Sequence, residues 1–418
     1  MNGARVRPKV VASTATIRRA PDQVKKLFVR QLEVFPPQGT DIRDNFFSLQ
    51  RPPGPKWPGR RYLGLCAFGR RYPAAIIRAY VAHMAAAQLL YDRHGRVADP
   101  WMTLTGYFNS IRELAGTRRL VEDDIRARLR DADQRGLAKR RVRMGAVEEL
   151  TSRKPGGDIP KILDRLDMVF DPAAEAARRA DREEGKRPAP APYDAILATN
   201  MISVGVDIDR LGLMVVAGQP KNTSEYIQAT SRVGRSAHGP GLVCTVFNWA
   251  RPRDLSHFER FEHYHETFYK HVEPLSVTPF SARALDRGLS GVLVSLIRLW
   301  DERLNANPMA GEIRDDDPLW GTVSKLLADR GGNALDDTQV RKRLEDMFNR
   351  RRDEWLHRVR QQEVHRLTYN TEAGAFVPLL EKPTGGRWEL FTCLNSLRDV
   401  EENVKLVLDQ NPGGLRPE

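Results

Sequence analysis

The sequence has few cysteines and no long apolar run, and each scarcity excludes a class of protein. Cys66, Cys244 and Cys393 are far apart, so they form neither a C-x-x-C pair for zinc nor an even set for a disulfide framework. No apolar run approaches the roughly 20 residues that cross a bilayer. After the basic start only residues 10–12 are apolar, which argues against a secretory leader. We therefore expect a cytoplasmic protein with no membrane partner.

Acidic residues are also scarce relative to basic ones. The 418 residues include 67 Lys and Arg against 54 Asp and Glu, which gives a formal net charge of +13. Because 41% of the residues are hydrophobic, the chain has enough apolar surface to build folded cores, and its length suggests two or three domains. The positive excess lowers the cost of approaching a phosphate backbone, so a nucleic acid is the leading candidate partner.

The order of strand and helix patterns indicates how the chain is organised. A short strand at 10–12 and a helix at 21–32 read as the end of a domain, and a proline-rich linker follows. Apolar runs then alternate with helical patterns, which is typical of a parallel sheet built from βα units. Strands are predicted at 62–68, 101–108, 195–199, 213–217 and 242–247, and helices at 74–91, 110–120, 285–304 and 338–362. Residues 171–192 are too polar to add much core, so they form an exposed helix and connector inside this domain.

The most informative residues lie in two neighbouring segments, 196–209 (ILATNMISVGVDID) and 226–235 (YIQATSRVGR). In the second segment Gln228, Arg232 and Arg235 are spaced i, i+4 and i+7, which predicts that they share one helix face. Two guanidinium groups and an amide facing one way suit a polyphosphate, because Arg forks bind phosphate oxygens bidentately. A bare R-x-G-R sequence is more often a solvated basic face, so the interpretation depends on the preceding segment.

The start of the helix in the second segment is marked by a possible cap. Asn222 precedes it, and Glu225 follows three residues later, as a capping box requires. The sequence therefore predicts that these two side chains cap the helix.

These two segments resemble motifs V and VI of superfamily 2 helicases and translocases. Motif V has an Ala-Thr pair followed closely by Gly-Val-Asp-Ile, and motif VI reads Q-x-x-x-R-x-G-R. Residues 14–16 (TAT) resemble motif III, and residues 104–110 (LTGYFNS) resemble motif IV, so the four motifs follow the helicase order over about the first 250 residues.

The resemblance implies an α/β fold: a RecA-like parallel-sheet helicase lobe with a mostly helical C-terminal accessory region. It assigns four regions. They are the tail of a first RecA-like lobe (1–34), a linker (35–58), the second lobe (59–250, with its polar insertion near 171–192) and the helical accessory region (251–418).

Roles carry over onto the matching positions. Arg232 and Arg235 would be catalytic arginine fingers, with Gln228 beside them. The nucleotide cofactor would be approached by Gly205 and Asp207, where Asp207 orients the ribose or the neighbouring arginine.

The remaining motif positions imply contacts with nucleic acid and coupling. Thr199 would meet a nucleic-acid phosphate, as would Asn109 and Ser110, although the last two could simply cap the next helix. Thr14 and Thr16 would couple lobe closure to nucleic-acid movement, although an ordinary turn at the end of a strand explains them equally well.

The sequence also departs from the helicase pattern. A working helicase needs a phosphate loop, G-x-x-x-x-G-K-[ST], and an acidic box that holds magnesium, both before motif III. Residues 64–71 (GLCAFGRR) imitate only the glycine spacing, so we treat them as a decoy. We therefore expect the C-terminal part of an ATP-dependent helicase, inactive alone, whose ATP and Mg²⁺ are held mainly by the missing N-terminal lobe. The chain would then be a fragment, a truncated gene product or a split subunit, and we expect it to bind no metal itself.

Aromatic and histidine residues follow motif VI. Phe258, Phe261, His265 and Phe268 fall at helical spacing, which favours packing under the sheet over a surface on which bases stack. His263 and His265 have no Cys or paired acidic ligand at a metal-binding spacing.

Residues 248–280, with 41–48 and 394–401, look similar to the helicase-like subunit of DISARM, a bacterial system that restricts phage DNA. That resemblance implies DNA as substrate and a defence-system partner protein with a helicase-associated domain. A DNA methyltransferase would be encoded nearby.

Two other functions stay open at this point. The chain could be a non-catalytic DNA-binding or scaffold subunit of a defence or repair complex, in which the motif residues persist without a nucleotide. It could also be a basic factor that acts on RNA, which salt-dependent binding to DNA and RNA would distinguish.

Overall fold

The chain folds as two compact units, which are described separately. The structure is a computed structural model. It describes residues 8–14, 16–35, 37, 40–41, 43–44, 46, 49, 51–151, 154, 156–203, 207–236, 239–274, 276–335, 338–361, 366–371, 376–381 and 388–393. The sheet unit contains the chain up to Arg18 and Val34–Pro274, and the helical unit contains Arg19–Glu33 and the chain from Leu275.

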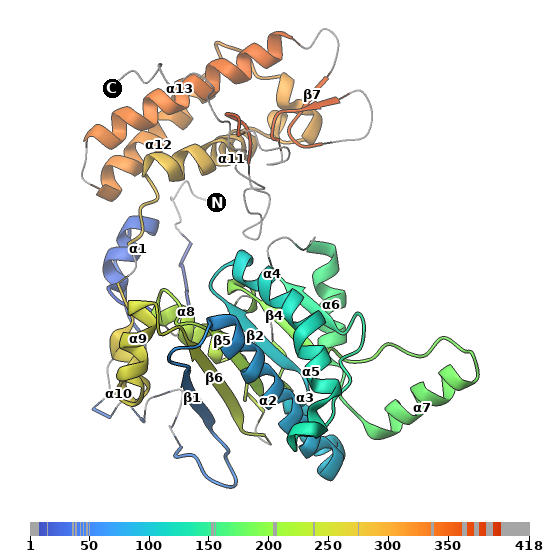
Figure 1. Ribbon diagram of the computed structural model, residues 1–418. Helices are drawn as coiled ribbons and strands as arrows, with labels where there is room; N and C mark the ends of the chain where they lie inside the picture. The colour runs from blue at the N-terminus through green and yellow to red at the C-terminus, as the bar shows by residue number, and fades with distance from the viewer. Residues whose placement is uncertain are drawn as a thin grey trace, which may run out of the picture. The chain divides into compact units, whose positions relative to one another are not determined.

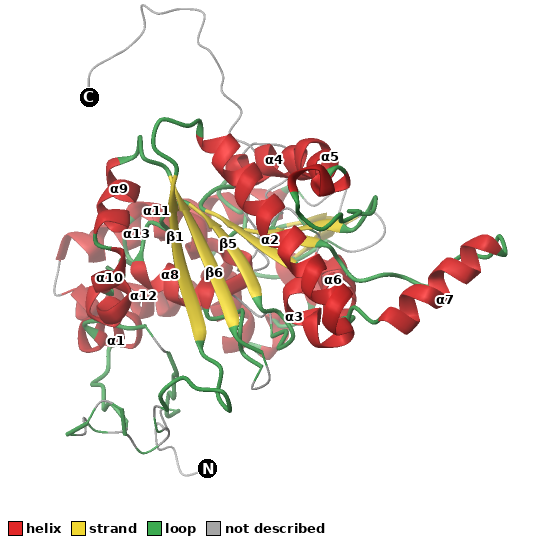
Figure 2. Cartoon of the chain, turned by 60° about the horizontal axis from the view of Figure 1, so that its bottom comes forward, coloured by secondary structure: helices red, strands yellow, loops and turns green. Residues whose placement is uncertain are grey.

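Six parallel strands make the sheet of the first unit. Their spatial order is β1-β6-β5-β2-β4-β3, and Figures 1 and 2 show β1, β6 and β5 side by side. The bounds are β1 Arg60–Cys66, β2 Leu104–Phe108, β3 Val147–Leu150, β4 Ala195–Ala198, β5 Leu213–Ala217 and β6 Gly241–Phe247. An open sheet with crossovers between parallel strands confirms the predicted α/β, RecA-like architecture.

Both faces of the sheet are buried along its central strands, as their continuous apolar runs require. Because side chains alternate along a strand, Val215 of β5 enters one core cluster while Met214 and Val216 enter another. All five residues of β5 are buried. The two clusters therefore hold helices on opposite faces of the same sheet.

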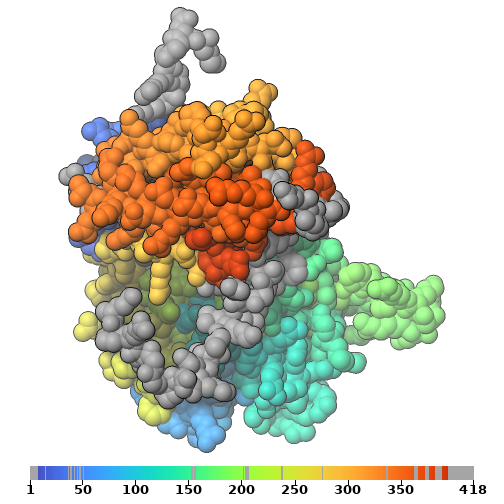
Figure 3. Space-filling model, turned by 90° about the horizontal axis from the view of Figure 1, so that it is seen from above, coloured from blue at the N-terminus to red at the C-terminus, as the bar shows by residue number. Residues whose placement is uncertain are grey.

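One face is covered by α2, α4 and α5, and the other by α6, α8 and α10. The helices of the sheet unit are α2 Tyr72–His94, α3 Asp99–Met102, α4 Ile111–Leu120, α5 Arg126–Arg130, α6 Ile159–Asp167, α7 Pro172–Glu183, α8 Thr223–Thr230, α9 Pro252–Glu259 and α10 Phe261–Thr267. A single π-helical segment, Val121–Ile125, joins α4 to α5. Helix α7 projects from this unit, as predicted for the polar insertion (Figure 3).

One predicted strand is absent, and one observed strand was not predicted. Residues 10–12 form no strand, and the side chain of Val11 is 85% exposed, so this apolar triplet contributes nothing to the sheet. The edge strand β3 was not predicted, because Glu148 and Glu149 stand in its middle. Lys154 and Arg118 satisfy these carboxylates at 2.7 and 2.9 Å, so the charges are tolerated at the edge of the sheet.

The second unit is mainly helical, as predicted. It contains α1 Ala20–Phe28, α11 Ala282–Trp300, α12 Leu319–Leu335 and α13 Thr338–Arg360, with the short parallel strands β7 Arg366–Thr368 and β8 Phe376–Pro378. Trp355 is fully buried in its core and donates its Nε1–H to the carbonyl of Ala310 at 2.8 Å. Arg351 is also buried, and its Nε donates to Ser290 Oγ at 2.9 Å. No helix in the described part of the chain has the length and apolar character to span a membrane.

Candidate functional site

Several sequence-predicted site residues stand where parallel strands end. Asn109 directly follows β2, and Thr199 directly follows β4, so both lie at the carboxyl edge of the sheet, where open α/β sheets bind ligands. Asn109 Nδ2 donates to the carbonyls of Ala217 and Gln219 at 3.1 and 3.4 Å. Ser110 Oγ accepts the backbone N–H of Glu113 at 3.2 Å and thereby caps α4. Asn109 thus ties β2 to the end of β5, whereas Ser110 is a helix cap.

Thr199 opens the loop that carries the motif V residues. Its side chain is 7% exposed, and its hydroxyl donates to Asn200 Oδ1 at 3.4 Å. A short 3₁₀ turn, Asn200–Ser203, follows and contacts α8. Gly205 lies outside the described residues. The loop returns at Asp207, whose side chain is 75% exposed.

The two arginines of motif VI lie after the C-terminal end of α8, not within the helix. Helix α8 ends at Thr230, so the prediction that Gln228, Arg232 and Arg235 share one helix face is wrong. The chain turns instead through Gly234, which has φ +66° and donates its N–H to Leu211 at 2.7 Å. A Cβ on Gly234 would lie 2.5 Å from Gly241 Cα, so only glycine allows this close approach to β6.

The turn brings three charged groups of motifs V and VI together. Arg235 forms an ion pair with Asp207, and the arginine side chain is 36% exposed. An exposed pair of this kind adds little stability, so its consequence is the orientation of the guanidinium group. Burial, and then the positive charge of Arg235, lower the pKa of Arg232, while Asp207 acts in the opposite direction. Two positive charges therefore act on each other here, and one of them is paired with Asp207, an arrangement that suits a polyanion.

Gln228 connects motif VI to the segment that resembles motif III. Its Nε2 donates to Thr16 Oγ1 at 2.7 Å, across 212 positions of sequence. Thr16 is 8% exposed, and its own N–H donates to Thr14 Oγ1 at 3.4 Å. The structure thus brings Thr16 next to α8 and Thr14 next to Thr16, although residues 10–12 do not form the predicted strand.

The amino end of α8 is capped by a carboxylate that is remote in sequence. Asn222 makes no side-chain cap bond, so the predicted capping box is absent. The N–H of Thr223 donates instead to Glu273, at 3.0 Å to Oε1 and 2.9 Å to Oε2. Glu225 is engaged elsewhere, because its Oε1 accepts the hydroxyl of Tyr107 at 2.5 Å. A carboxylate at a helix N-terminus is favourable, and no local signal announces one 50 residues away.

Another carboxylate, this one buried, fixes the loops after β5 and β6. Asp254 is fully buried and accepts the backbone N–H groups of Gln219 at 3.1 Å and Asn248 at 3.0 Å. Sequence reasoning missed this residue, because an Asp in the first turn of a helix such as α9 usually faces solvent.

The aromatic residues after motif VI pack within the sheet unit, which confirms the prediction of packing. The ring of Phe261 faces Phe247 of β6 with centroids 6.1 Å apart. His265 lies between Phe261 and Tyr226, donates from Nδ1 to the Phe261 carbonyl and accepts the Tyr226 hydroxyl at Nε2, at 2.7 and 2.9 Å. Burial lowers the pKa of His265. Among the described residues, no group of three His, Cys, Asp or Glu side chains is arranged to hold a metal ion.

Comparison with known proteins agrees with the motif assignment. Residues 171–237, which include β4, β5, α8 and the arginine turn, match the helicase conserved C-terminal domain family. The DISARM protein DrmA of Bacillus paralicheniformis is 38% identical over 418 aligned residues, covering 96% of this chain and 35% of DrmA. The chain thus spans about a third of the length of this curated relative.

Solved helicase structures are similar at low identity. DUF1998 helicase MrfA bound to DNA matches with a TM-score of 0.34 at 14% identity, over 56% of this chain and 26% of MrfA. Domain 2 of the DEAD-box helicase Mss116p, bound to an RNA duplex, matches with a TM-score of 0.30 at 10% identity, over 66% of this chain and 87% of that domain. Residues 171–237 of the parallel-sheet unit thus match the helicase conserved C-terminal domain family, in a chain whose sequence is similar to a DISARM protein.

Proposed function

We propose that this chain supplies the second lobe of an ATP-dependent DNA helicase or translocase. The observation that supports the proposal best is the turn after α8, which carries Arg232 and pairs Arg235 with Asp207, while Gln228 links α8 to Thr16. Two arginines at a lobe surface, oriented by a carboxylate, are what charge stabilisation on a transferring phosphoryl group requires.

The donor set of this chain fits a triphosphate but cannot by itself hold one with a metal. Bound ATP, with Mg²⁺, supplies the phosphoanhydride whose cleavage drives movement. Arg232 and Arg235 would donate to phosphate oxygens, and the exposed pair with Asp207 would keep the Arg235 guanidinium in place before contact. No phosphate loop with its lysine occurs in the sequence, so the triphosphate and Mg²⁺ would be held mainly by a first lobe.

Gln228 would couple the arginines to nucleic acid. Its hydrogen bond to Thr16 joins α8 to the segment resembling motif III, so a displacement of one would displace the other. Thr199, which directly follows β4 at the carboxyl edge of the sheet, would meet a nucleic-acid phosphate beside the loop tied by Asn109. Gly205 and Asp207 would complete the approach to the nucleotide.

The similarity to DrmA supports a proposal for the biological setting. Since the chain spans about a third of that relative, the phosphate loop and acidic box would come from other regions or from a partner. We propose a role in defence against phage in the cytoplasm, with DNA as substrate and a defence-system protein as partner. The net charge of +13 agrees with a nucleic-acid substrate.

The test combines the purified chain with the first lobe encoded upstream of Met1 or in a neighbouring gene. We expect DNA-stimulated ATP hydrolysis only in the combination, and a fall in kcat of about 10³-fold or more for Arg235→Ala. DNA affinity should change little in that variant. Arg78→Ala, which removes an exposed arginine from α2, is the matched control and should hydrolyse ATP like the wild type.

The rival functions give different results in the same assay. Bound DNA without hydrolysis, and indifference to Arg235→Ala, would establish the non-catalytic scaffold instead. Turnover by the chain alone that disappears in Arg235→Ala would contradict the missing-lobe assignment. Tighter binding and stronger stimulation by RNA than by DNA at equal salt would reassign the substrate.

A further inference from the structure

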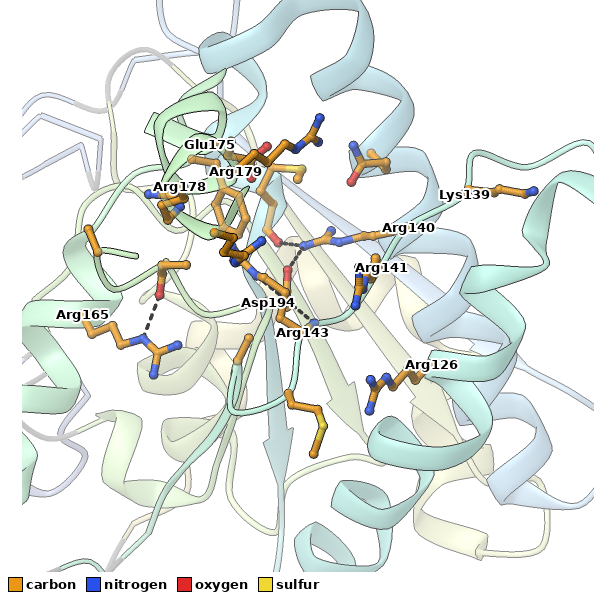
Figure 4. Close-up of a pocket in the computed structure, with 18 residues that line it drawn as sticks. Arg126, Lys139, Arg140, Arg141, Arg143, Arg165, Glu175, Arg178, Arg179 and Asp194 are labelled. Carbon is orange, nitrogen blue, oxygen red and sulfur yellow. Dashed lines mark hydrogen bonds and ion pairs between the residues drawn. The ribbon is translucent and has the colours of Figure 1, made fainter. Parts of the chain in front are cut away.

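A strongly basic pocket lies in the sheet unit, apart from the motif residues. It has a volume of about 870 Å³, and nine arginine and lysine side chains line it, against the two carboxylates of Glu175 and Asp194 (Figure 4). Its walls come from α2, α5 and α7 and from the segments just before β2, β3 and β4. Asn109 and Thr199 follow the opposite ends of β2 and β4, so this pocket opens at the other edge of the sheet.

The floor of the pocket is a closed ion network. Arg140 and Asp194 are buried, and Arg140 Nη2 donates to Asp194 Oδ1 at 3.0 Å. The other carboxylate oxygen accepts the backbone N–H of Arg143 at 3.1 Å and its Nε at 3.3 Å. Both oxygens of Asp194 are thus engaged, and this carboxylate cannot neutralise any further cation.

Five other arginines have no such partner. Among the described residues, no hydrogen bond or ion pair is made by the guanidinium groups of Arg126, Arg141, Arg178, Arg179 and Arg182. Arg178 is the decisive member, because it is only 6% exposed and its Nη2 has no hydrogen-bond partner. Glu175, one turn earlier on α7, is the single remaining carboxylate of the pocket.

Burying a positive charge without a partner costs free energy, so an arginine in this position points to a functional role such as binding an anion. Figure 4 shows Arg178 and Arg179 of α7 on one side of Asp194, and Arg126 and Arg141 on the other. Arginine forks on several sides match the spread oxygens of linked phosphate groups better than a single carboxylate.

We propose that this pocket binds the polyphosphate group of a small ligand, of the class of inorganic or nucleoside polyphosphates. A small ligand is favoured over a nucleic-acid strand because the volume falls in the range of small-molecule sites. The proposal does not depend on the helicase function, since none of the motif residues lines the pocket.

The test measures binding of sodium tripolyphosphate to the purified full chain by calorimetry and by its effect on thermal unfolding. Arg126→Gln and Arg178→Gln should each weaken binding about tenfold, the usual effect of losing a charge-assisted hydrogen bond. The matched controls are Arg128→Gln, on the same helix as Arg126, and Arg187→Gln, beyond α7. Both remove one exposed positive charge outside the pocket and should bind within twofold of the wild type.

Arg178→Gln has a second expected signature. Without ligand this variant should melt at a higher temperature than the wild type, because it removes a buried unpaired cation, yet it should gain less from tripolyphosphate. A variant that simply failed to fold would melt lower, and the variant of the half-buried Arg126 then still decides the question.

Three results would overturn the proposal. Equal loss in the Arg128→Gln control would mean attraction to general positive charge. Loss in Arg235→Ala, with binding intact in Arg178→Gln, would place tripolyphosphate at the motif VI arginines. If the two pocket variants lose affinity for a single-stranded oligonucleotide while tripolyphosphate binds no better than chloride, the pocket is part of a nucleic-acid path. None of these outcomes requires ATP hydrolysis, so they are independent of the helicase test.

Discussion

Replacement of Arg140 by methionine should destabilise the sheet unit more than loss of any other single charge around the pocket. The guanidinium group is buried and joins three segments: it donates to the carbonyls of Met84 and Met102 and to the carboxylate of Asp194. Methionine keeps the length of the side chain and its apolar stem, so the change removes the charge and the hydrogen bonds without creating a large cavity.

The expected loss follows from what stays behind. Asp194 is 3% exposed and would keep only Arg143, while the carbonyl of Met102 would lose its donor. Removing one partner of a buried ion pair typically costs 3–5 kcal/mol, because the other charge remains without compensation. The retained bonds from Arg143 place the expected value near the lower end, at about 3 kcal/mol. Such a loss is a large part of the roughly 5–15 kcal/mol that stabilises a domain.

Amide hydrogen exchange is the suitable assay, because the protein has two units and a single melting temperature would mix them. Exchange in the peptides that contain β2 and β4 should become more than a hundredfold faster in Arg140→Met, while α12 and α13 in the helical unit stay unchanged. Arg143→Met is the control: its side chain is 23% exposed, so its loss should cost about 1 kcal/mol. A cost below about 1 kcal/mol for Arg140→Met, or an equal cost in the control, would refute this reasoning.

Three further predictions concern the sheet unit. Burial lowers the pKa of His265 in the folded protein. The stabilisation that comes from keeping this histidine neutral is therefore complete above the unfolded-state pKa near 6.5 and is lost as the pH falls through the lower folded-state pKa. Melting curves between pH 7.5 and 5 should show this loss of stability, and the loss should be smaller in His265→Gln. Burial raises the pKa of Cys244 to about 12, so iodoacetamide at pH 8 should leave this thiol unmodified in the native protein and alkylate it after denaturation, as peptide mass mapping would reveal. Gly106→Ala places a methyl group against the hydroxyl of Tyr80 and 2.9 Å from Leu197 Cδ2. Urea denaturation should therefore show that the free energy of unfolding falls by about 2–3 kcal/mol. The control Gly116→Ala, which has open space around it, should leave this free energy unchanged.

The fold was predictable where apolar runs and polar breaks were clear. Strands β4, β5 and β6 are short continuous apolar runs, which a parallel sheet buried on both faces produces. Strand β3 was not predicted because Glu148 and Glu149 interrupt its apolar pattern. Partners distant in sequence, such as Arg118, pair with these carboxylates and so allow them in the strand. Residues 10–12 misled for the opposite reason, since an apolar triplet without a neighbouring strand stays exposed.

The motif residues were identifiable by sequence, whereas their geometry was not. Spacing alone put Gln228, Arg232 and Arg235 on a helix face, because the rule assumes that the helix continues. The helix ends at Thr230 because Gly234 donates its N–H to Leu211, earlier in the chain, and packs closely against Gly241, later in the chain. Local propensity contains no information about such contacts.

The position of α8, and with it the arginine turn, is set from both ends by remote segments. Glu273 accepts the N–H of Thr223 at the amino end, and Thr16 accepts from Gln228 near the carboxyl end. A force on either segment therefore acts on one short helix of eight residues, and the turn that carries Arg232 begins directly after it. If a first lobe pulls on the chain before Thr16, the displacement reaches the arginines through a single hydrogen bond. Gln228→Leu, which removes that bond while leaving both arginines in place, should therefore uncouple DNA stimulation from hydrolysis without abolishing hydrolysis itself.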